Sequence, residues 1–443
     1  MEQLNLFASE ERESRKDKRP PPRTPRERLG ALLEADLDFQ GAKTGYASHS
    51  WHAFAAKFPP QLPRHFIQGL TEPGDVVLDP MAGSGTAVVE ALLLRRIGIG
   101  VDLDPLAVQI AQVKLTHLPS SKLLGAARRV LSKTRRLLEE GEAITRRLHA
   151  FDTPTREFIE YWFLPATQRE LMALSMAIQE EPDAKARRFL RLVFSSTIVT
   201  KSGGVSLARD LAHSRPHRDL AKRPRSALEA FQVRLGKAMQ GMESLSRGGQ
   251  AIILHGNARH LPLADNTVHL VVTSPPYANA IDYMRAHKFS LVWMGKRIPD
   301  LSRWRGRYIG AERLGDFEPP PFPTATQQVI QTLAERDARR ARVLGKYFFE
   351  MQQVLGEMHR VLRPGAAAVI VVGTSTMRGM NVQTHLCLAE LAEEVGFDLV
   401  RIVERGIDRD RRMMPARWGA KTTQIEQRMH HEYVIGLLKP EEG

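Results

Sequence analysis

The fold of this 443-residue chain is decided by the stretch VVLDPMAGSGTAVVEALLLRRIGIGVDLDP, residues 76 to 105. The β-branched, apolar run at 76–78 predicts a buried strand, and the apolar residues from 87 to 95 predict a helix. A glycine-containing turn joins the two, and a second apolar run from 97 to 101 ends just before Asp102. This order of strand, turn, helix and strand predicts an α/β fold built on a parallel-rich sheet.

The glycine turn has the features of a ligand-binding loop. Gly83 and Gly85 allow the backbone to approach a ligand closely, and the following helix offers unpaired amides at its N-terminus. Asp102 comes about twenty residues later, where doubly wound folds place an acid that accepts hydrogen bonds from a ribose. The full dinucleotide glycine spacing is missing and no lysine follows Gly85, so a single adenosyl group fits better than a dinucleotide or a P-loop phosphate. A purely structural tight turn is the alternative.

A second stretch, LVVTSPPYANA at 270–280, places unusual chemistry at the end of a strand. The apolar run ends in Ser274, Pro275, Pro276 and Tyr277. Two consecutive prolines fix their own φ and supply no backbone donor, so we expect a stiff loop with unpaired carbonyls. The loop therefore presents a hydroxyl, carbonyl oxygens and an aromatic face together.

These two stretches resemble the S-adenosylmethionine-dependent amino methyltransferases that modify exocyclic nitrogens in DNA. The family signature is D-P-x-x-G-S-G-T for the cofactor and S-P-P-Y, D-P-P-Y or N-P-P-Y for catalysis, and this chain carries DPMAGSGT, GVDLDP and TSPPY. The resemblance covers about residues 50 to 118 and 251 to 380. It implies a Rossmann-like class I methyltransferase sheet, interrupted here by a helical basic insert, with S-adenosyl-L-methionine as the cofactor.

The resemblance also implies a set of cofactor-binding residues. Phe58, in AAKFPPQLP, resembles a Phe-Pro element that packs beside the cofactor, with a plain core role as the alternative. Asn257, in HGNARHLPLADNTVHLVV, stands where the family has an acidic side chain against the adenine amino group, and its carbonyl oxygen can still accept a hydrogen bond. The remaining residues lie at the strand ends and on the glycine turn: Asp79, which suits a cationic ligand, Gly83, Ser84, Gly85, Thr86 and Asp102.

The catalytic residues implied by the resemblance are Ser274, Pro275, Pro276 and Tyr277. An exocyclic amino nitrogen is a poor nucleophile because its lone pair is delocalised into the base. Fixed acceptors, such as Ser274 Oγ and the Pro275 carbonyl, favour a more tetrahedral nitrogen and aim its lone pair at the methyl group. Tyr277 offers a face on which a flipped base can stack. The proton need not leave before methyl transfer, so no strong base is required.

The charge of the chain predicts a polyanionic partner. Sixty-four Lys and Arg residues exceed 50 Asp and Glu residues, which gives a net charge of +14, and such an excess is typical of nucleic-acid binding. Most of it lies between residues 119 and 250, where about 24 basic side chains face about 14 acidic ones. We expect this insert to contact DNA phosphates, with Arg215, Arg218, Arg223 and Arg225 as the candidates. The alternative is a general enrichment in arginine.

The chain divides into four parts by composition. Residues 1–45 are polar and proline-bearing and are expected to be a disordered or loosely attached tail. Residues 46–118 form the cofactor-binding half of the catalytic domain, residues 119–250 the helical basic insert, and residues 251–443 the catalytic half. Within the last part, 296–340 is an excursion with aromatics among arginines, which indicates either a surface loop or a segment that touches nucleic acid.

Several classes of protein and site are disfavoured. No uninterrupted apolar stretch approaches the roughly 20 residues that span a bilayer, and the N-terminus has no apolar signal-peptide core. Cys387 is the only cysteine, so neither an intramolecular disulfide nor a thiolate cluster is expected. His213, His217 and His430–His431 lack companion ligands at metal-binding spacing, so we expect no metal site. We expect a cytoplasmic protein without a membrane partner.

The choice of base and polymer rests on family analogy. Serine in the first position of the tetrapeptide is commoner among enzymes that make N4-methylcytosine, and aspartate and asparagine among adenine-N6 enzymes. We therefore expect a site-specific DNA methyltransferase acting on cytosine N4, with adenine N6 as the alternative. A tRNA or rRNA guanine-N2 methyltransferase and a catalytically silent nucleic-acid-binding defence subunit are further alternatives. The expected partners are double-stranded DNA and a possible cognate restriction nuclease.

Overall fold

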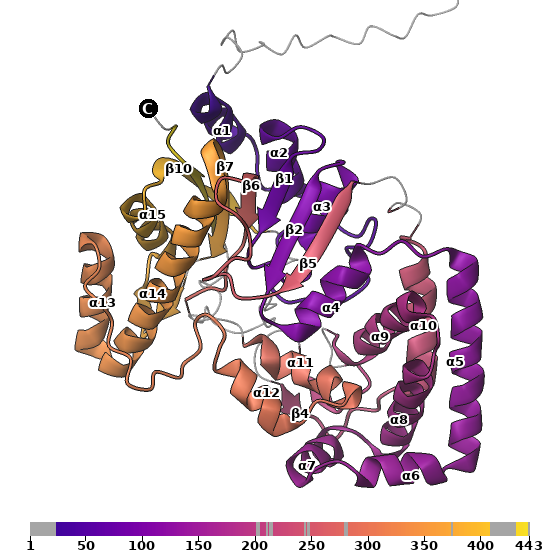
Figure 1. Cartoon of the computed structure of the whole chain (residues 1–443). Helices are drawn as coiled ribbons and strands as arrows, with labels where there is room; N and C mark the ends of the chain where they lie inside the picture. Colours follow the sequence, from indigo (N-terminus) through magenta and orange to yellow (C-terminus); the bar gives the residue numbers. More distant parts are fainter. Residues whose placement is uncertain are drawn as a thin grey trace, which may run out of the picture.

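The computed structural model describes residues 24–200, 204–209, 211, 216–242, 245, 249–278, 282–373, 375–407 and 431–441. Figure 1 shows a twisted sheet with helices on both of its faces and a group of helices below one end of it. This arrangement confirms the expected α/β class with a helical insert.

The main sheet has seven strands in the order β10-β11-β7-β6-β1-β2-β5. The five strands from β7 to β5 run parallel, whereas β11 is antiparallel to both of its neighbours. The carboxyl ends of the parallel strands therefore meet at one edge of the sheet. The bounds are β1 Val76–Asp79, β2 Ile97–Asp102, β5 Gln250–His255, β6 Val268–Thr273, β7 Leu362–Gly373, β10 Asp398–Gly406 and β11 His431–Leu438.

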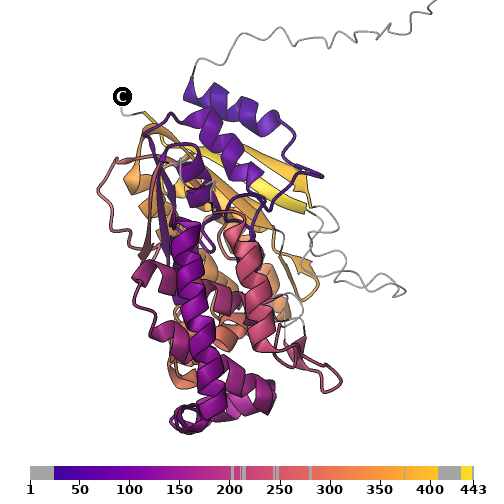
Figure 2. The same cartoon turned by 90° about the vertical axis from the view of Figure 1, so that its right-hand side faces the viewer.

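Helices cover the two faces of the sheet. On one face, α1 (Pro25–Glu34), α2 (Gln61–Leu70) and α3 (Thr86–Leu93) pack against Val77, Leu270 and the inner residues of β7. On the other face, α13 (Thr324–Arg336), α14 (Ala338–Val361) and α15 (Thr384–Glu394) pack against Val268, Val271 and their neighbours. Figure 2 shows α1 and α2 lying together against the sheet.

Helix α1 differs from the tail expected at residues 1–45. Leu29 and Leu33 are fully buried in the core under the sheet. A capping box formed by Thr24 and Glu27 begins the helix, and such a box satisfies amides that a helix start leaves unpaired. From residue 25 to 34 the chain is therefore a packed helix, while residues 1–23 lie outside the described part.

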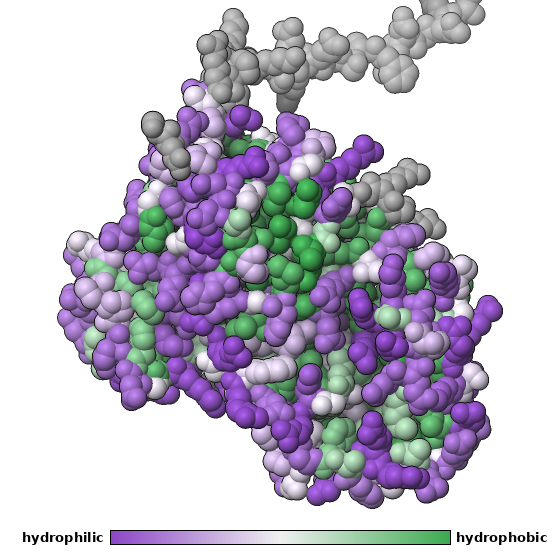
Figure 3. Space-filling view, viewed as in Figure 1, coloured by the Kyte–Doolittle hydropathy of each residue, from purple (hydrophilic) through white to green (hydrophobic). Residues whose placement is uncertain are grey.

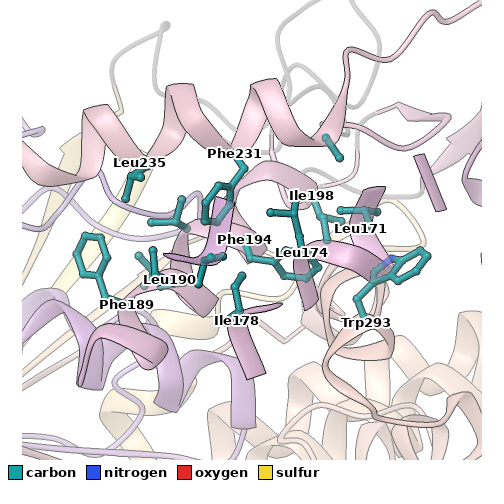
Figure 4. Packing of buried hydrophobic residues seen from close by; sticks show 14 of the residues in the cluster. Leu171, Leu174, Ile178, Phe189, Leu190, Phe194, Ile198, Phe231, Leu235 and Trp293 are labelled. Atoms are coloured by element: carbon teal, nitrogen blue, oxygen red, sulfur yellow. The ribbon is translucent and has the colours of Figure 1, made fainter. Parts of the chain in front are cut away.

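The basic insert consists of packed helices. Its inner side chains, including Phe189, Phe194 and Phe231, form the core shown in Figure 4. The same cluster contains Ile110 from the cofactor half and Phe289 from the catalytic half, so the insert is fixed to both. The elements are α4 Pro105–Lys114, α5 Ser120–Glu140, α6 Glu142–His149, α7 Thr153–Trp162, α8 Pro165–Gln179, α9 Ala184–Ile198 and α10 Ala227–Met239, of which α4 precedes the insert, and the short strands β3 Ala208–Arg209 and β4 His217–Arg218.

The segment after β6 returns to the insert before it reaches α14. Helix α11 (Tyr283–Leu291), the 3-10 helix η2 (Val292–Met294) and α12 (Ile298–Arg305) pack there. Between β7 and α15, the chain forms a small antiparallel pair of strands, β8 (Thr376–Met377) and β9 (Met380–Asn381). The expected 296–340 excursion thus contains α12 and α13 with an irregular segment between them.

Residues 363–365, which contain a proline followed by a glycine, belong to the beginning of β7. Gly365 has a φ of +73°, yet its amide donates to the Lys439 carbonyl at 2.9 Å, and the Lys439 amide donates to the Ala366 carbonyl at 2.9 Å. These bonds pair the segment with the chain at the end of β11. The strand is therefore longer than the apolar run at 367–372 indicates.

The face seen in Figure 3 is mostly hydrophilic. Figure 3 shows one hydrophobic area near its centre, over β2 and β5, where Ile252 is 51% exposed. Among the helices that the structure describes, none has the length and apolar character needed to cross a bilayer.

Candidate active site

A cleft lies at the edge where the parallel strands end. Loops after β1, β2, β5 and β6 supply most of its wall, as expected for ligand sites in open α/β sheets. The predicted residues that line it are Phe58, Asp79, Gly83, Ser84, Thr86, Asp102, Asn257, Ser274 and Pro276. Gly85, Pro275 and Tyr277 do not line it. The cofactor motif and the serine of the catalytic loop, nearly 200 residues apart in sequence, therefore share one cleft.

The glycine turn is shaped so that its backbone faces the cleft. Gly83 and Gly85 have φ values of +50° and +79°, which side chains other than glycine rarely adopt. A Cβ at Gly85 would lie 2.9 Å from Ala111 Cβ. The buried Lys114 Nζ donates to the Ser84 carbonyl at 3.0 Å, while Ser84 Oγ is buried without a partner among the described residues. The turn is thus held in place and keeps one free hydroxyl beside the cleft.

Asp79 and Asp102 are buried carboxyls with raised pKa values. Burial raises the pKa of Asp79 to about 7, although its hydrogen bond from Thr273 Oγ1, at 2.7 Å, opposes this. Burial and the neighbouring charge of Asp104 raise the pKa of Asp102 to about 6. Asp102 accepts hydrogen bonds from the amides of Gly83 (2.7 Å) and Asp104 (2.8 Å). Both carboxyls retain lone pairs for a ligand, and a cation or hydroxyl donor would favour their ionised forms.

Asp104 holds together one wall of the cleft. The sequence motifs did not predict this wall. Asp104 Oδ1 caps α4, and its Oδ2 accepts from Tyr308 Oη at 3.0 Å and contacts His287 Nδ1 at 2.8 Å. Burial alone would raise the pKa of Asp104, but His287 lowers it below its ordinary value. Tyr308 comes from the 296–340 excursion and lines the cleft. The excursion is therefore part of the site wall.

Two further aromatic rings line the same wall. Phe54 and Tyr283 are stacked, with their ring centroids 5.2 Å apart and an interplanar angle of 26°. Phe54 also contacts the glycine turn, because a Cβ at Gly83 would lie 3.1 Å from its ring. Phe54 lies four residues before the expected Phe58 in the sequence. Only its position close to that motif could have indicated that Phe54 lines the cleft.

The catalytic loop is held from behind by tyrosines and an acid. Tyr347 Oη donates to the Pro276 carbonyl at 2.9 Å, so this carbonyl is not free as expected. Tyr277 is only 8% exposed, and its hydroxyl donates to Glu432 Oε1 at 2.9 Å. Its ring lies against Gly373, where a Cβ would approach it to 2.7 Å. The loop therefore presents Ser274 to the cleft and keeps most of Tyr277 in the core.

Asn257 lines the cleft, but its carbonyl oxygen is already engaged. Oδ1 accepts from the Arg259 amide and from Arg259 Nε, each at 3.2 Å. The expected acceptor for an adenine amino group is thus turned toward a neighbouring side chain.

The candidate DNA-contacting arginines lie away from the cleft wall. Arg218, Arg223 and Arg225 are exposed, and the Arg218 guanidinium lies over the exposed ring of Tyr161 at 4.4 Å from its centroid. Arg215 lies outside the described residues, as do His213 and His430 of the histidine pairs. Within the described part of the chain, no three His, Cys, Asp or Glu side chains are grouped so that they could hold a metal ion.

The residues of the cleft fit S-adenosylmethionine. Gly83 lines the cleft beside Ser84, and the unpartnered Ser84 Oγ offers a hydroxyl. Asp102 at the end of β2 suits ribose hydroxyls, and Asp79 suits a cationic group. Aromatic and apolar walls, including Phe54 and Ile309, suit a flat base.

Comparisons with known proteins agree with this fit. Residues 9–113 match the N6_N4_Mtase family model, described as DNA methylase. The chain is 23% identical over 382 residues to the type II methyltransferase M.MvaI of Kocuria varians, covering 80% of this chain and 83% of that protein. It is 21% identical over 411 residues to the type II methyltransferase M.BsoBI of Geobacillus stearothermophilus, covering 82% and 81%.

Solved structures show weaker likeness. A putative DNA modification methylase from Thermus thermophilus, complexed with S-adenosyl-L-methionine, is 22% identical with a TM-score of 0.22, covering 42% of this chain and 55% of that one. By the family match over residues 9–113 and the two relatives that span most of its length, the chain is similar to the DNA methylases of the N6/N4 family and to type II methyltransferases.

Proposed function

We propose that this enzyme methylates N4 of cytosine at a specific sequence in double-stranded DNA. The observation that carries the proposal is that Ser274, a neutral hydroxyl, lines the same cleft as Asp79 and Asp102. The preference for cytosine follows from the family analogy for serine in this position. Adenine N6 is the second candidate, because a hydroxyl can also accept from that amino group.

The chain's own groups would act on the amino nitrogen through hydrogen bonds. Ser274 Oγ and the Pro275 carbonyl would accept its two N–H groups and aim the lone pair along the cleft. The Pro276 carbonyl already accepts from Tyr347, so we assign the role to the Pro275 carbonyl. When bound, the cofactor supplies a methyl group activated by its sulfonium.

The cofactor would lie along the wall from the glycine turn to Asn257. Gly83, Ser84 and Thr86 would surround its methionine part beside Asp79 and Phe58, Gly85 would shape the turn, and Asp102 would bind the ribose hydroxyls. Tyr277 would support the flipped base through the small part of its ring that is exposed.

The basic insert would bind the duplex. The exposed Arg218, Arg223 and Arg225 support this role, since such side chains neutralise phosphates, and Arg215 is proposed with them from the sequence. We propose that residues 119–250 form the DNA-recognition region, and that the cofactor-binding and catalytic halves lie on either side of it in sequence. A cognate restriction nuclease that cuts the unmethylated site is the expected functional partner.

Mass spectrometry of nucleosides tests the product. DNA is incubated with the enzyme and isotopically labelled S-adenosylmethionine, and labelled N4-methylcytosine is expected. Ser274→Ala should abolish labelling while cofactor binding persists, and Ser302→Ala, at an exposed position on α12, is the matched control. Labelled N6-methyladenine would overturn the base. Label confined to RNA would favour the guanine-N2 alternative, and no label in any nucleic acid would favour a silent binding subunit.

A further inference from the structure

The loop after β5 contains an asparagine whose orientation is fixed by its neighbours. Asn257 and His260 form a tight bridge in which the His260 backbone amide donates to the backbone carbonyl of Asn257 at 2.9 Å. Asn257 Oδ1 accepts from both the amide and Nε of Arg259, each at 3.2 Å. Exchanging the two ends of the side-chain amide would place an NH2 group against two N–H donors, which is unfavourable. The oxygen therefore faces Arg259.

Arg259 is itself held by a buried acid on α14. Its Nη1 lies 3.3 Å from Glu350 Oε1, and the Glu350 side chain is 5% exposed. Glu350 also pairs with Lys346 at 3.1 Å and accepts from the Gly310 amide at 3.0 Å. The guanidinium is thus fixed by a buried charge, and with it the direction of the Asn257 amide.

The free end of Asn257 is a hydrogen-bond donor. The side chain lines the cleft, and the described residues provide no partner for its Nδ2. A primary amide nitrogen carries two N–H groups and accepts nothing. A ring nitrogen of a purine complements such a donor, whereas an exocyclic amino group, itself a donor, does not.

We infer that Asn257 recognises the adenine of the cofactor by donating to a ring nitrogen, and that Arg259 and Glu350 position it for this. The inference deepens the proposed function and rests on it, since it requires the cofactor to lie in this cleft. It replaces the role expected from the sequence, in which Asn257 accepts from the adenine amino group. Asn257 would therefore select purines that keep an acceptor at this edge of the ring.

The test is binding of S-adenosylhomocysteine and its analogues, measured by calorimetry without DNA. One analogue lacks the 6-amino group, and three others replace N1, N3 or N7 by carbon. Each is compared between wild type and Asn257→Ala. We expect the wild type to lose between about twofold and tenfold in affinity for one deaza analogue, and Asn257→Ala to lose this discrimination. The 6-deamino analogue should be weakened equally in both proteins.

A second variant separates donor from acceptor without removing the side chain. Asn257→Asp replaces the donor by an oxygen but keeps a partner for Arg259, so the loop should fold. We expect it to bind S-adenosylhomocysteine as weakly as Asn257→Ala does. Asn381→Asp, at an exposed site where Oδ1 likewise accepts a backbone amide at 3.0 Å, makes the same charge change and should bind like wild type.

The outcomes are decisive for the donor role. Three results would each overturn it. The first is a discrimination lost in Asn257→Ala that concerns the 6-amino group, and the second is that no analogue distinguishes the wild type from Asn257→Ala. The third is that Asn257→Asp binds S-adenosylhomocysteine as tightly as the wild type. A wild-type protein that does not bind S-adenosylhomocysteine at all would instead overturn the placement of the cofactor in this cleft, and with it the proposed function.

Discussion

The hydroxyl of Tyr277 offers a direct test of how the catalytic loop is held. It is buried and donates to Glu432 Oε1 at 2.9 Å. Glu432 is 12% exposed and pairs through its other oxygen with Arg405, which is 5% exposed. Arg405 in turn donates to the carbonyl of Leu37 at 2.9 Å. Replacing Tyr277 by Phe removes only the hydroxyl and leaves the ring against Gly373.

The expected loss follows from the charge and burial of the acceptor. Hydrogen bonds to charged groups contribute about 1.5–3 kcal/mol, so Tyr277→Phe should lower the free energy of unfolding by about 2 kcal/mol. Glu432→Gln should cost about 3 kcal/mol or more, because Arg405 loses its counter-charge in a buried position. The double variant should be more stable than the sum of the two losses predicts, because both changes act on the same charged hydrogen bond.

Urea unfolding measures these losses through the transition midpoint and slope. Tyr433→Phe is the matched control: its hydroxyl donates to Glu404 Oε2 at 3.0 Å, but the Glu404 side chain is 50% exposed. This substitution should cost at most about 1 kcal/mol. A Tyr277→Phe protein as stable as wild type, or losses that simply add in the double variant, would refute the reasoning.

Three further predictions concern the cofactor and the DNA. Asp102→Ala should weaken cofactor binding by about 1–3 kcal/mol, because two ribose hydroxyls lose a charged acceptor, while DNA binding is kept. If calorimetry gives the variant the cofactor affinity of the wild type, Asp102 does not bind the ribose. Asp79, whose pKa burial raises to about 7, should bind a cationic group only when ionised, so cofactor affinity should fall between pH 8 and pH 6; an equal fall in Asp79→Asn would assign it to another group. Replacing Arg218, Arg223 and Arg225 by Ala should weaken DNA binding and flatten its dependence on salt, and an unchanged slope would place them outside the interface.

The parts of the fold that local sequence encodes could be predicted. The apolar runs with clear ends predicted β1, β2 and β6, because a buried strand needs a continuous apolar run and a clear end. Asp79, Asp102 and Ser274 were each predicted at the end of a strand, and parallel strands bring their carboxyl ends to one edge. A local pattern and one topological rule thus located most of the cleft.

The parts that depend on distant contacts could not be predicted. Tyr308 reaches the cleft from an irregular segment, and only its bond to Asp104, 204 residues away in sequence, explains its position. Tyr277 was expected to present its ring, but Glu432, 155 residues away, draws its hydroxyl into the core. Helix α1 is a different case, because the Thr24 and Glu27 capping box is local, and the surrounding charged and proline-rich composition obscured it.

Buried acids from the second half of the chain hold two of the loops of the proposed site. Glu350 on α14 holds Arg259 and so directs Asn257, while Glu432 on β11 holds Tyr277. Each acid also has a cationic partner, so removing either one would leave a charge unpaired in a largely dry environment. Polar groups fixed in this way need not reorganise when a reaction develops charge, which is the main source of electrostatic catalysis. Variants at Glu350 and Glu432 should therefore alter binding and turnover although neither residue lines the cleft.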